Sequence, residues 1–164
     1  MILYLVRHGI AVDPTDPHSP AEPERPLTAK GVQKTRAAAL GLRALGAKPD
    51  ILITSPYIRA AQTAEIFAEA LGYPTSKLRA SEVLAPGANP ADAVKEISKL
   101  RAKEVMCFGH APHLDHMISL LAGARGVFTS LKKAGAACFE QSNPRGQWEL
   151  RWILTAKLLR QLAE

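Results

Sequence analysis

Four residues able to bind or transfer an anionic group, Arg7, His8, Arg59 and His110, each lie shortly after a short apolar run of the chain. An arginine presents a planar fork of cationic donors to phosphoryl oxygens, and a neutral imidazole is a nucleophile or a proton carrier. Taken singly, such residues are usually core histidines or solvated charges. Together they would repel one another unless an anion were bound, and each charge-assisted hydrogen bond to that anion contributes about 1.5–3 kcal/mol. We therefore expect a phosphoryl site if the fold brings all four together.

The elements that must position these residues are strands and helices in alternation. Short apolar runs predict buried β-strands at residues 2–6, 51–53, 104–108, 136–140 and 148–154, and residues 78–84 could hold a further short one. Capping residues, prolines and apolar positions three or four apart predict helices from Thr28 to Gly46, from Ser55 to Gly72, from Asn89, from Pro112 and after Thr155. In the second of these helices Ser55 is the expected N-cap.

This alternation predicts an α/β fold, a three-layer α/β/α sandwich with a mostly parallel central sheet. The last two strands are joined by a short turn, so we expect an antiparallel addition at one edge. In such sheets the ligand crevice lies beyond the carboxyl ends of the strands, where the two arginines and two histidines are expected to meet. With 164 residues the chain is long enough for one domain, residues 1–164.

The composition of the chain indicates which class of ligand to expect and in which compartment the protein works. The net charge is +6, which favours an anionic ligand, but the basic residues are scattered and aromatic residues make up only 5%. We therefore expect no nucleic acid partner. The run Ile2–Val6 is too short for a signal peptide or a membrane span, which predicts a cytoplasmic protein with no membrane association. Cys107 and Cys138 are expected to be buried thiols.

Residues 13–26 hold five prolines among acidic and small residues, which predicts a loop directly after the first strand. Its position makes it a candidate lid over the site, with an ordinary solvated loop as the alternative. Arg25, at the end of this loop, is expected to be a surface charge, with a place at the pocket rim as the alternative.

Four segments of this chain resemble the motifs of the histidine phosphatase superfamily, the phosphoglycerate mutase-like proteins. They are the sequences LYLVRHG at residues 3–9, RPLTAKG at 25–31, TSPYIRAAQTAE at 54–65 and GHAPHL at 109–114. The resemblance covers the chain from Met1 to about Leu121. Because the chain is short and lacks the long insertion of the mutases, it is most similar to the phosphohistidine phosphatases of the SixA type.

The resemblance implies that His8 is the nucleophile and carries the phosphoryl group as a covalent phosphohistidine intermediate. It further implies that Arg7, Arg59 and His110 bind the phosphoryl oxygens and that neither a metal nor another cofactor is needed. The neighbouring arginine charges should keep the imidazole of His8 neutral, as a nucleophile requires. A carbonyl near Gly9 could hold the other ring N–H, and Gly9 would permit a sharp turn.

Two further assignments stay open. Ser55 either contributes a hydroxyl contact to the substrate or serves only as a helix cap. Glu82, after the third strand, corresponds in place to the acid that protonates the leaving oxygen in the mutase-like branch. The loop acids are the alternative proton donors; they are Asp13, Asp16 and Glu24.

The leading prediction is a metal-independent phosphatase that acts on phosphohistidine in a protein. The alternatives are a phosphatase for small phosphorylated metabolites and a mutase-like phosphotransferase. A non-catalytic phosphate-binding module is more remote. So is a zinc hydrolase, because His110, His113, Asp115 and His116 only approach a known zinc motif and no histidine follows them. The glycine pattern of dinucleotide-binding proteins is missing after the first strand.

Overall fold

A computed structural model describes residues 1–143 and 146–163. The strands are β1 (Ile2–Arg7), β2 (Ile51–Thr54), β3 (Arg79–Ala80), β4 (Glu104–Gly109), β5 (Ala136–Glu140) and β6 (Glu149–Leu154). The α-helices are α1 (Ala29–Ala44), α2 (Ile58–Leu71), α3 (Pro90–Ser98), α4 (His113–Leu121) and α5 (Ala156–Gln161). Three short 3₁₀ helices complete the list: η1 (Glu22–Glu24), η2 (Thr75–Lys77) and η3 (Glu82–Leu84).

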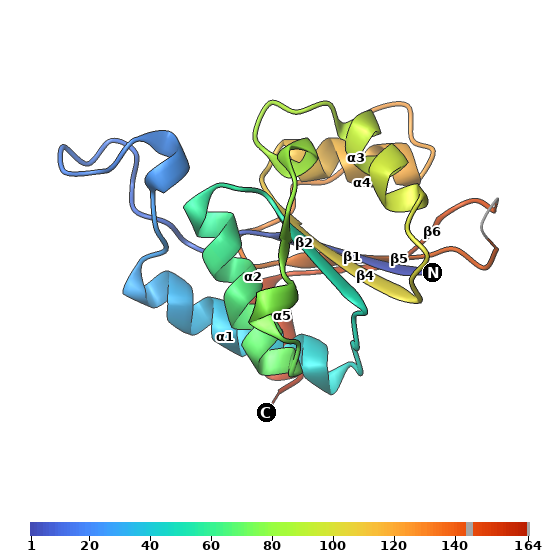
Figure 1. Ribbon diagram of the computed structural model, residues 1–164, viewed down its shortest axis with the longest axis horizontal. Helices are drawn as coiled ribbons and strands as arrows, with labels where there is room; N and C mark the ends of the chain where they lie inside the picture. The colour runs from blue at the N-terminus through green and yellow to red at the C-terminus, as the bar shows by residue number, and fades with distance from the viewer. Residues whose placement is uncertain (144–145, 164) are drawn as a thin grey trace.

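The sheet has the order β3-β2-β4-β1-β5-β6. Strands β1 to β4 are parallel, whereas β5 runs antiparallel to both β1 and β6. Helices α1, α2 and α5 cover one face, and α3 and α4 cover the other (Figure 1). The predicted three-layer sandwich, with its antiparallel addition at one edge, is confirmed.

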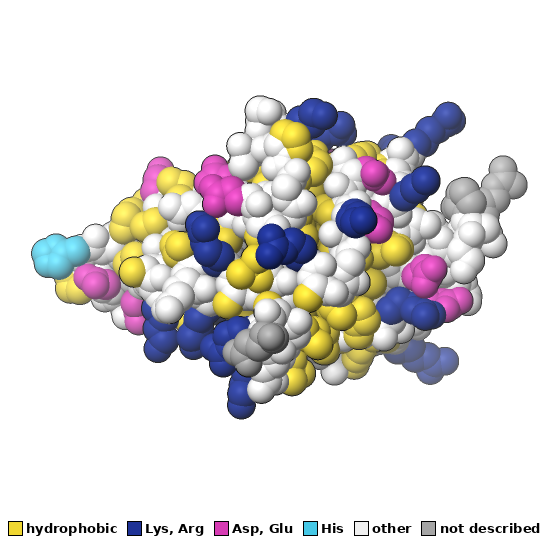
Figure 2. All heavy atoms as spheres, turned by 90° about the horizontal axis from the view of Figure 1, so that it is seen from below, with side chains coloured by type: hydrophobic (Ala, Val, Ile, Leu, Met, Phe, Trp, Pro, Cys, Tyr) yellow, Lys and Arg dark blue, Asp and Glu magenta, His cyan; other side chains and the backbone are white. Residues whose placement is uncertain are grey.

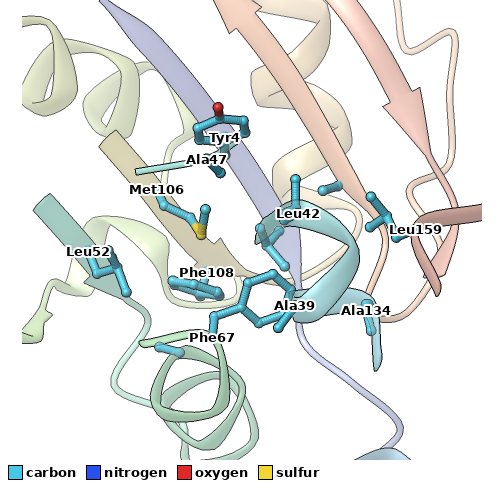
Figure 3. Packing of buried hydrophobic residues seen from close by; sticks show 14 of the residues in the cluster. Tyr4, Ala39, Leu42, Ala47, Leu52, Phe67, Met106, Phe108, Ala134 and Leu159 are labelled. Carbon is cyan, nitrogen blue, oxygen red and sulfur yellow. The ribbon is translucent and has the colours of Figure 1, made fainter. Parts of the chain in front are cut away.

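Strand β1 contributes side chains to the hydrophobic cores on both faces of the sheet. Tyr4 and Val6 point to the α1, α2 and α5 face, while Leu3 and Leu5 point to the α3 and α4 face. Adjacent residues of a strand face opposite sides, so a continuous apolar run supplies both cores. In the first core the rings of Phe67 and Phe108 meet edge to face with centroids 5.3 Å apart (Figure 3).

Side-chain caps start three helices where the sequence predicts them. The hydroxyl of Thr28 accepts a hydrogen bond from the Gly31 amide at the start of α1, and Asn89 and Thr155 cap α3 and α5 in the same way. For α2 the predicted end at Leu71–Gly72 is confirmed, but the prediction of Ser55 as its N-cap is wrong. This helix begins at Ile58 with Tyr57 at the N-cap and no side-chain cap bond.

Two more features differ from or extend the sequence expectation. In the region 78–84, only Arg79 and Ala80 pair with β2, and the chain then turns into η3. The segment 12–27 extends from the body of the molecule at the side of α1 and α2 (Figure 1). None of the helices in the described residues combines the length and the hydrophobicity that a membrane span requires.

Candidate active site

The carboxyl ends of the parallel strands meet at one edge of the sheet. Arg7 at the end of β1 pairs with Gly109 at the end of β4, and the next amide, that of His8, donates to the Gly109 carbonyl over 2.9 Å. The Ser55 amide, just after β2, donates to the Phe108 carbonyl over the same distance. The segments after β1, β2 and β4 therefore lie side by side, as the topology predicts.

The His8 ring is held in one orientation. Nδ1 lies 2.7 Å from the Gly9 carbonyl, which can only accept, so Nδ1 carries the proton and Nε2 keeps its lone pair. Nε2 faces Arg59, whose Nε lies 3.4 Å away. The side chain is almost fully buried, at 6% exposed. The ring thus presents the lone pair of Nε2 to a cationic donor, Arg59 Nε.

Burial lowers the pKa of His8 to about 4, and the charges of Arg59, Arg7 and Lys133 act in the same direction, while the bond to the Gly9 carbonyl opposes them. An imidazole with this pKa is neutral at neutral pH. A neutral ring is the form that can attack phosphorus.

Arg59 lies in the first turn of α2 and is buried. Its guanidinium lies 5.1 Å from the centroid of the Tyr57 ring, and its Nη1 donates to the Glu22 carbonyl over 2.8 Å. Its Nη2 forms an ion pair of 3.0 Å with the Glu22 carboxylate. These contacts hold the guanidinium in place beside His8.

His110 faces His8 across the site, with ring centroids 5.1 Å apart. Its Nε2 lies 2.8 Å from the Ser55 hydroxyl, and the Tyr57 ring packs against it edge to face. Burial, followed by the charges of His8 and Arg59, lowers the pKa of His110 to about 2. Its Nδ1 is buried without a hydrogen-bond partner among the described residues.

The Ser55 hydroxyl is committed to His110, which is the physical reason that it does not cap α2. It is fully buried and lies two residues before the N-cap position, where it accepts only a long bond of 3.3 Å from the Tyr57 amide. Ser55 therefore belongs to the site as a residue that orients His110.

Arg7 is held by the backbone of Leu131, which is itself held by Asp115. Its Nη1 donates to the Leu131 carbonyl over 2.8 Å, and the Leu131 amide donates to the buried Asp115 carboxylate over 2.7 Å. Its Nε is buried and has no partner among the described residues. Arg7 Nε and His110 Nδ1 are thus unsatisfied polar atoms on residues at the adjacent ends of β1 and β4, and such atoms cost free energy unless a ligand binds them.

Gly9 is required for space rather than for a turn, which corrects the sequence expectation. Its φ does not lie in the left-handed region, unlike those of Gly46, Gly72, Gly87 and Gly123. A Cβ at this position would collide with the Thr35 hydroxyl. The close approach places the Gly9 amide 3.0 Å from the Thr63 hydroxyl and the Gly9 carbonyl on His8.

The acids that the sequence offered as proton donors are not bonded to the histidines. Glu82 is exposed, in η3 after β3, and its carboxylate forms no ion pair with Arg7 or Arg59. Asp13 and Asp16 accept bonds from neighbours within the loop, the amides of Thr15 and His18. The structure does not bring these acids, or the exposed Glu24, into contact with His8.

The acid that does reach the site is Glu22, which the sequence analysis missed. Its carboxylate bridges Arg59 and Arg25, whose Nε lies 2.9 Å away. The bond from Arg25, with the charge of Arg59, lowers the pKa of Glu22, which therefore stays ionised. Arg25 is only 12% exposed in its side chain and is bonded to Glu22 and to the Val12 carbonyl, so its prediction as a surface charge is wrong. The spacing of Glu22 and Arg25 signals their pairing, whereas the link to Arg59 is visible only in three dimensions.

The residues of the suspected zinc motif have different surroundings. Asp115 is committed to the Leu131 amide, His113 is buried in α4, and His116 is exposed. Within residues 1–143 and 146–163, no three His, Cys, Asp or Glu side chains are grouped as metal ligands would be.

The chain belongs to the histidine phosphatase superfamily. The family model for branch 1 of this superfamily matches residues 3–82, which include Arg7, His8 and Arg59. An uncharacterized protein of Picosynechococcus sp. is 36% identical over 139 residues, which cover 82% of each chain.

Among the relatives, the SixA proteins match over nearly the whole length. The phosphohistidine phosphatase SixA of Escherichia coli is 27% identical over 160 residues, covering 92% of this chain and 93% of that protein. A solved structure of the protein histidine phosphatase SixA with tungstate has a TM-score of 0.84 at 22% identity, over 97% of this chain and 99% of the other. The fold is thus that of the phosphoglycerate mutase-like proteins.

Proposed function

We propose that this protein is a phosphatase that transfers a phosphoryl group to His8 Nε2 and then to water, with phosphohistidine in a protein as its substrate. The observation that carries the proposal is the His8 ring itself. Its Nδ1 donates to the Gly9 carbonyl, and its unprotonated Nε2 accepts a long hydrogen bond of 3.4 Å from Arg59 Nε. Membership of the superfamily and the similarity to SixA over almost the full chain support it.

In the first step, the Nε2 lone pair forms a bond to phosphorus while the bond from phosphorus to the leaving nitrogen breaks. The leaving imidazole takes its proton from solvent, because no described acid is bonded to His8 or His110 and Glu22, which pairs with Arg59, is ionised. Arg7, Arg59 and His110 Nδ1 would hold the phosphoryl oxygens, whose charge they offset during transfer. In the second step water attacks phosphorus, the bond to Nε2 breaks, and inorganic phosphate leaves with His8 neutral again.

The short connection between β3 and α3 leaves the site open to water. This favours hydrolysis of the phosphoryl group on His8 over its return to the substrate. Residues 81–89 alone separate β3 from α3, so the described chain has no inserted domain over this edge. Water and the exposed histidine of a folded protein can therefore both approach.

The test is to quench the protein during turnover of a ³²P-labelled phosphohistidine protein and to locate the label. We expect an acid-labile, alkali-stable adduct on His8 that His8→Ala abolishes without loss of fold. Screening a set of sugar phosphates alongside decides the substrate class. Rapid turnover of a sugar phosphate with none of the phosphohistidine protein would overturn the protein substrate, and turnover by His8→Ala would overturn the nucleophile.

A further inference from the structure

A basic cleft adjoins the catalytic residues on the α1 and α5 side of the sheet. It has a volume of about 510 Å³. Its lining comes from the end of β1, from α1, from the loop before β5 and from α5. The residues of this basic cleft are Arg7, Ile10, Lys34, Lys132, Lys133, Ala156, Lys157 and Arg160.

The basic cleft carries an excess of positive charge. Six of its eight residues are Lys or Arg, and among the described residues that line it none is acidic. The ion pairs of the described residues involve other cations, namely Arg25, Arg36, Arg59 and Arg151. Figure 2 shows Lys and Arg side chains gathered at the lower left of the molecule in that view. Holding so many like charges together costs free energy that a bound polyanion would offset.

The basic cleft adjoins the candidate active site through Arg7. This residue lines the cleft, and its Nη1 donates to the Leu131 carbonyl next to Lys132 and Lys133. The charge of Lys133 reaches His8, where it helps to lower the pKa of the ring. A ligand with its phosphoryl group on His8 would therefore extend into the cleft.

The size and lining of the basic cleft identify the kind of ligand. A water molecule occupies about 30 Å³ of liquid, so the cleft holds far more than one phosphoryl group. Its cations come from four separate segments and, apart from Arg7, are exposed on flexible stems, as suits several dispersed carboxylates. No aromatic side chain is among the described residues of the lining, so a base would find no stacking platform.

We propose that the basic cleft is the docking surface for an acidic stretch of the phosphorylated partner protein, which places the phosphorylated residue over His8. This inference rests on the proposed function for the identity of the partner. The docking surface itself can be tested without it, because an unphosphorylated acidic peptide should bind there.

The test compares charge reversals inside and outside the basic cleft. In one variant Lys34→Glu is combined with Lys157→Glu, and the matched control combines Lys77→Glu with Lys95→Glu, two exposed lysines outside the cleft that change the net charge equally. The probe is a dye-labelled, unphosphorylated peptide rich in glutamate, followed by fluorescence anisotropy. We expect the cleft variant to bind it about tenfold more weakly than the wild type and the control, with the difference reduced by added salt.

Activity measurements separate the docking surface from the catalytic pocket. All three proteins should hydrolyse p-nitrophenyl phosphate at the same rate, since none of the four lysines touches the reacting atoms. A phosphohistidine peptide flanked by glutamates should show a higher kcat/KM than its glutamine counterpart in the wild type only. If no phosphohistidine peptide is hydrolysed, the proposed function fails while the binding test still stands.

Two results would overturn the docking surface. One is equal binding of the glutamate peptide by the cleft variant and the control. The other is tighter binding of a single-stranded oligonucleotide of equal charge, which would assign the basic cleft to nucleic acid instead.

Discussion

At the scale of single residues, the site combines a histidine held neutral with guanidinium groups held charged. His8 is buried with its Nδ1 on a carbonyl, and its pKa falls to about 4. Arg59 keeps its charge beside it through Glu22. Phosphoryl transfer to an imidazole needs both groups close together, an unprotonated ring nitrogen and permanent cations.

The depressed pKa of His8 predicts how stability depends on pH. Unfolded His8 takes up a proton below about 6.5, but the folded ring resists it until about 4. The free energy of unfolding should therefore fall as the pH drops through this window, because the unfolded state binds more protons. Urea denaturation at about pH 7 and about pH 5 measures the loss, which should be smaller in His8→Ala. Equal losses in both proteins would contradict the assignment.

Arg59 predicts a loss of rate without loss of fold. Arg59→Ala removes the cation whose Nε lies 3.4 Å from His8 Nε2, so kcat/KM for p-nitrophenyl phosphate should fall by about 10²–10³. Steady-state kinetics measure it, with circular dichroism to follow folding. Arg36→Ala is the control, since Arg36 is also ion-paired, with Glu69, but is exposed. An unchanged kcat/KM in Arg59→Ala would remove it from the mechanism.

At the scale of elements, the segment 12–27 is more than a connection. Through Glu22 in η1, its backbone and its carboxylate both bind Arg59. The sequence left a lid and a solvated loop as alternatives. Contact with a buried arginine of the site favours the lid, which stays a prediction.

Glu22 is expected to compete with the phosphoryl group for Arg59. Glu22→Gln keeps the backbone bond but removes the charge, so inorganic phosphate should inhibit the variant at about two- to fivefold lower concentration. The Ki of phosphate against p-nitrophenyl phosphate measures this. Glu24→Gln is the matched control, because it removes an equal charge from an exposed neighbour that is not bonded to Arg59. Weaker inhibition in Glu22→Gln would show that the carboxylate only positions Arg59.

At the scale of the whole molecule, two cores hold the sheet that carries the site. Phe67 from α2 packs on Phe108 of β4, the strand that leads to His110. The position of the histidine therefore depends on the packing of α2 against β4. The same helix, α2, also supplies Arg59.

Phe67→Ala should destabilise the fold by about 3–5 kcal/mol, because it leaves a cavity among fully buried side chains. The same substitution at Phe128, which is 51% exposed, should change stability by at most about 0.5 kcal/mol. Urea denaturation of both variants against the wild type measures the difference. Similar effects at the two positions would contradict the burial that the structure assigns to Phe67.

Local signals predicted most of the architecture. Continuous apolar runs located β1, β2 and β4, and Thr28, Asn89 and Thr155 started the helices that they were expected to start. Ser55 failed as a cap because a partner 55 residues away, His110, binds its hydroxyl. A residue's local preference is overridden wherever a tertiary contact offers its polar group a better partner.

The sequence by itself determined the order in which strands and helices follow one another along the chain. It also identified the candidate site residues Arg7, His8, Arg59 and His110. Both follow from hydrophobic periodicity, caps and motifs, which are local properties of the chain. Tertiary structure alone decided that Gly9 needs space, that Glu22 pairs with Arg59, and that Glu82 is exposed. It also assembled the basic cleft from four segments. Such arrangements depend on distances between residues far apart in the chain, which become defined only when the two cores pack.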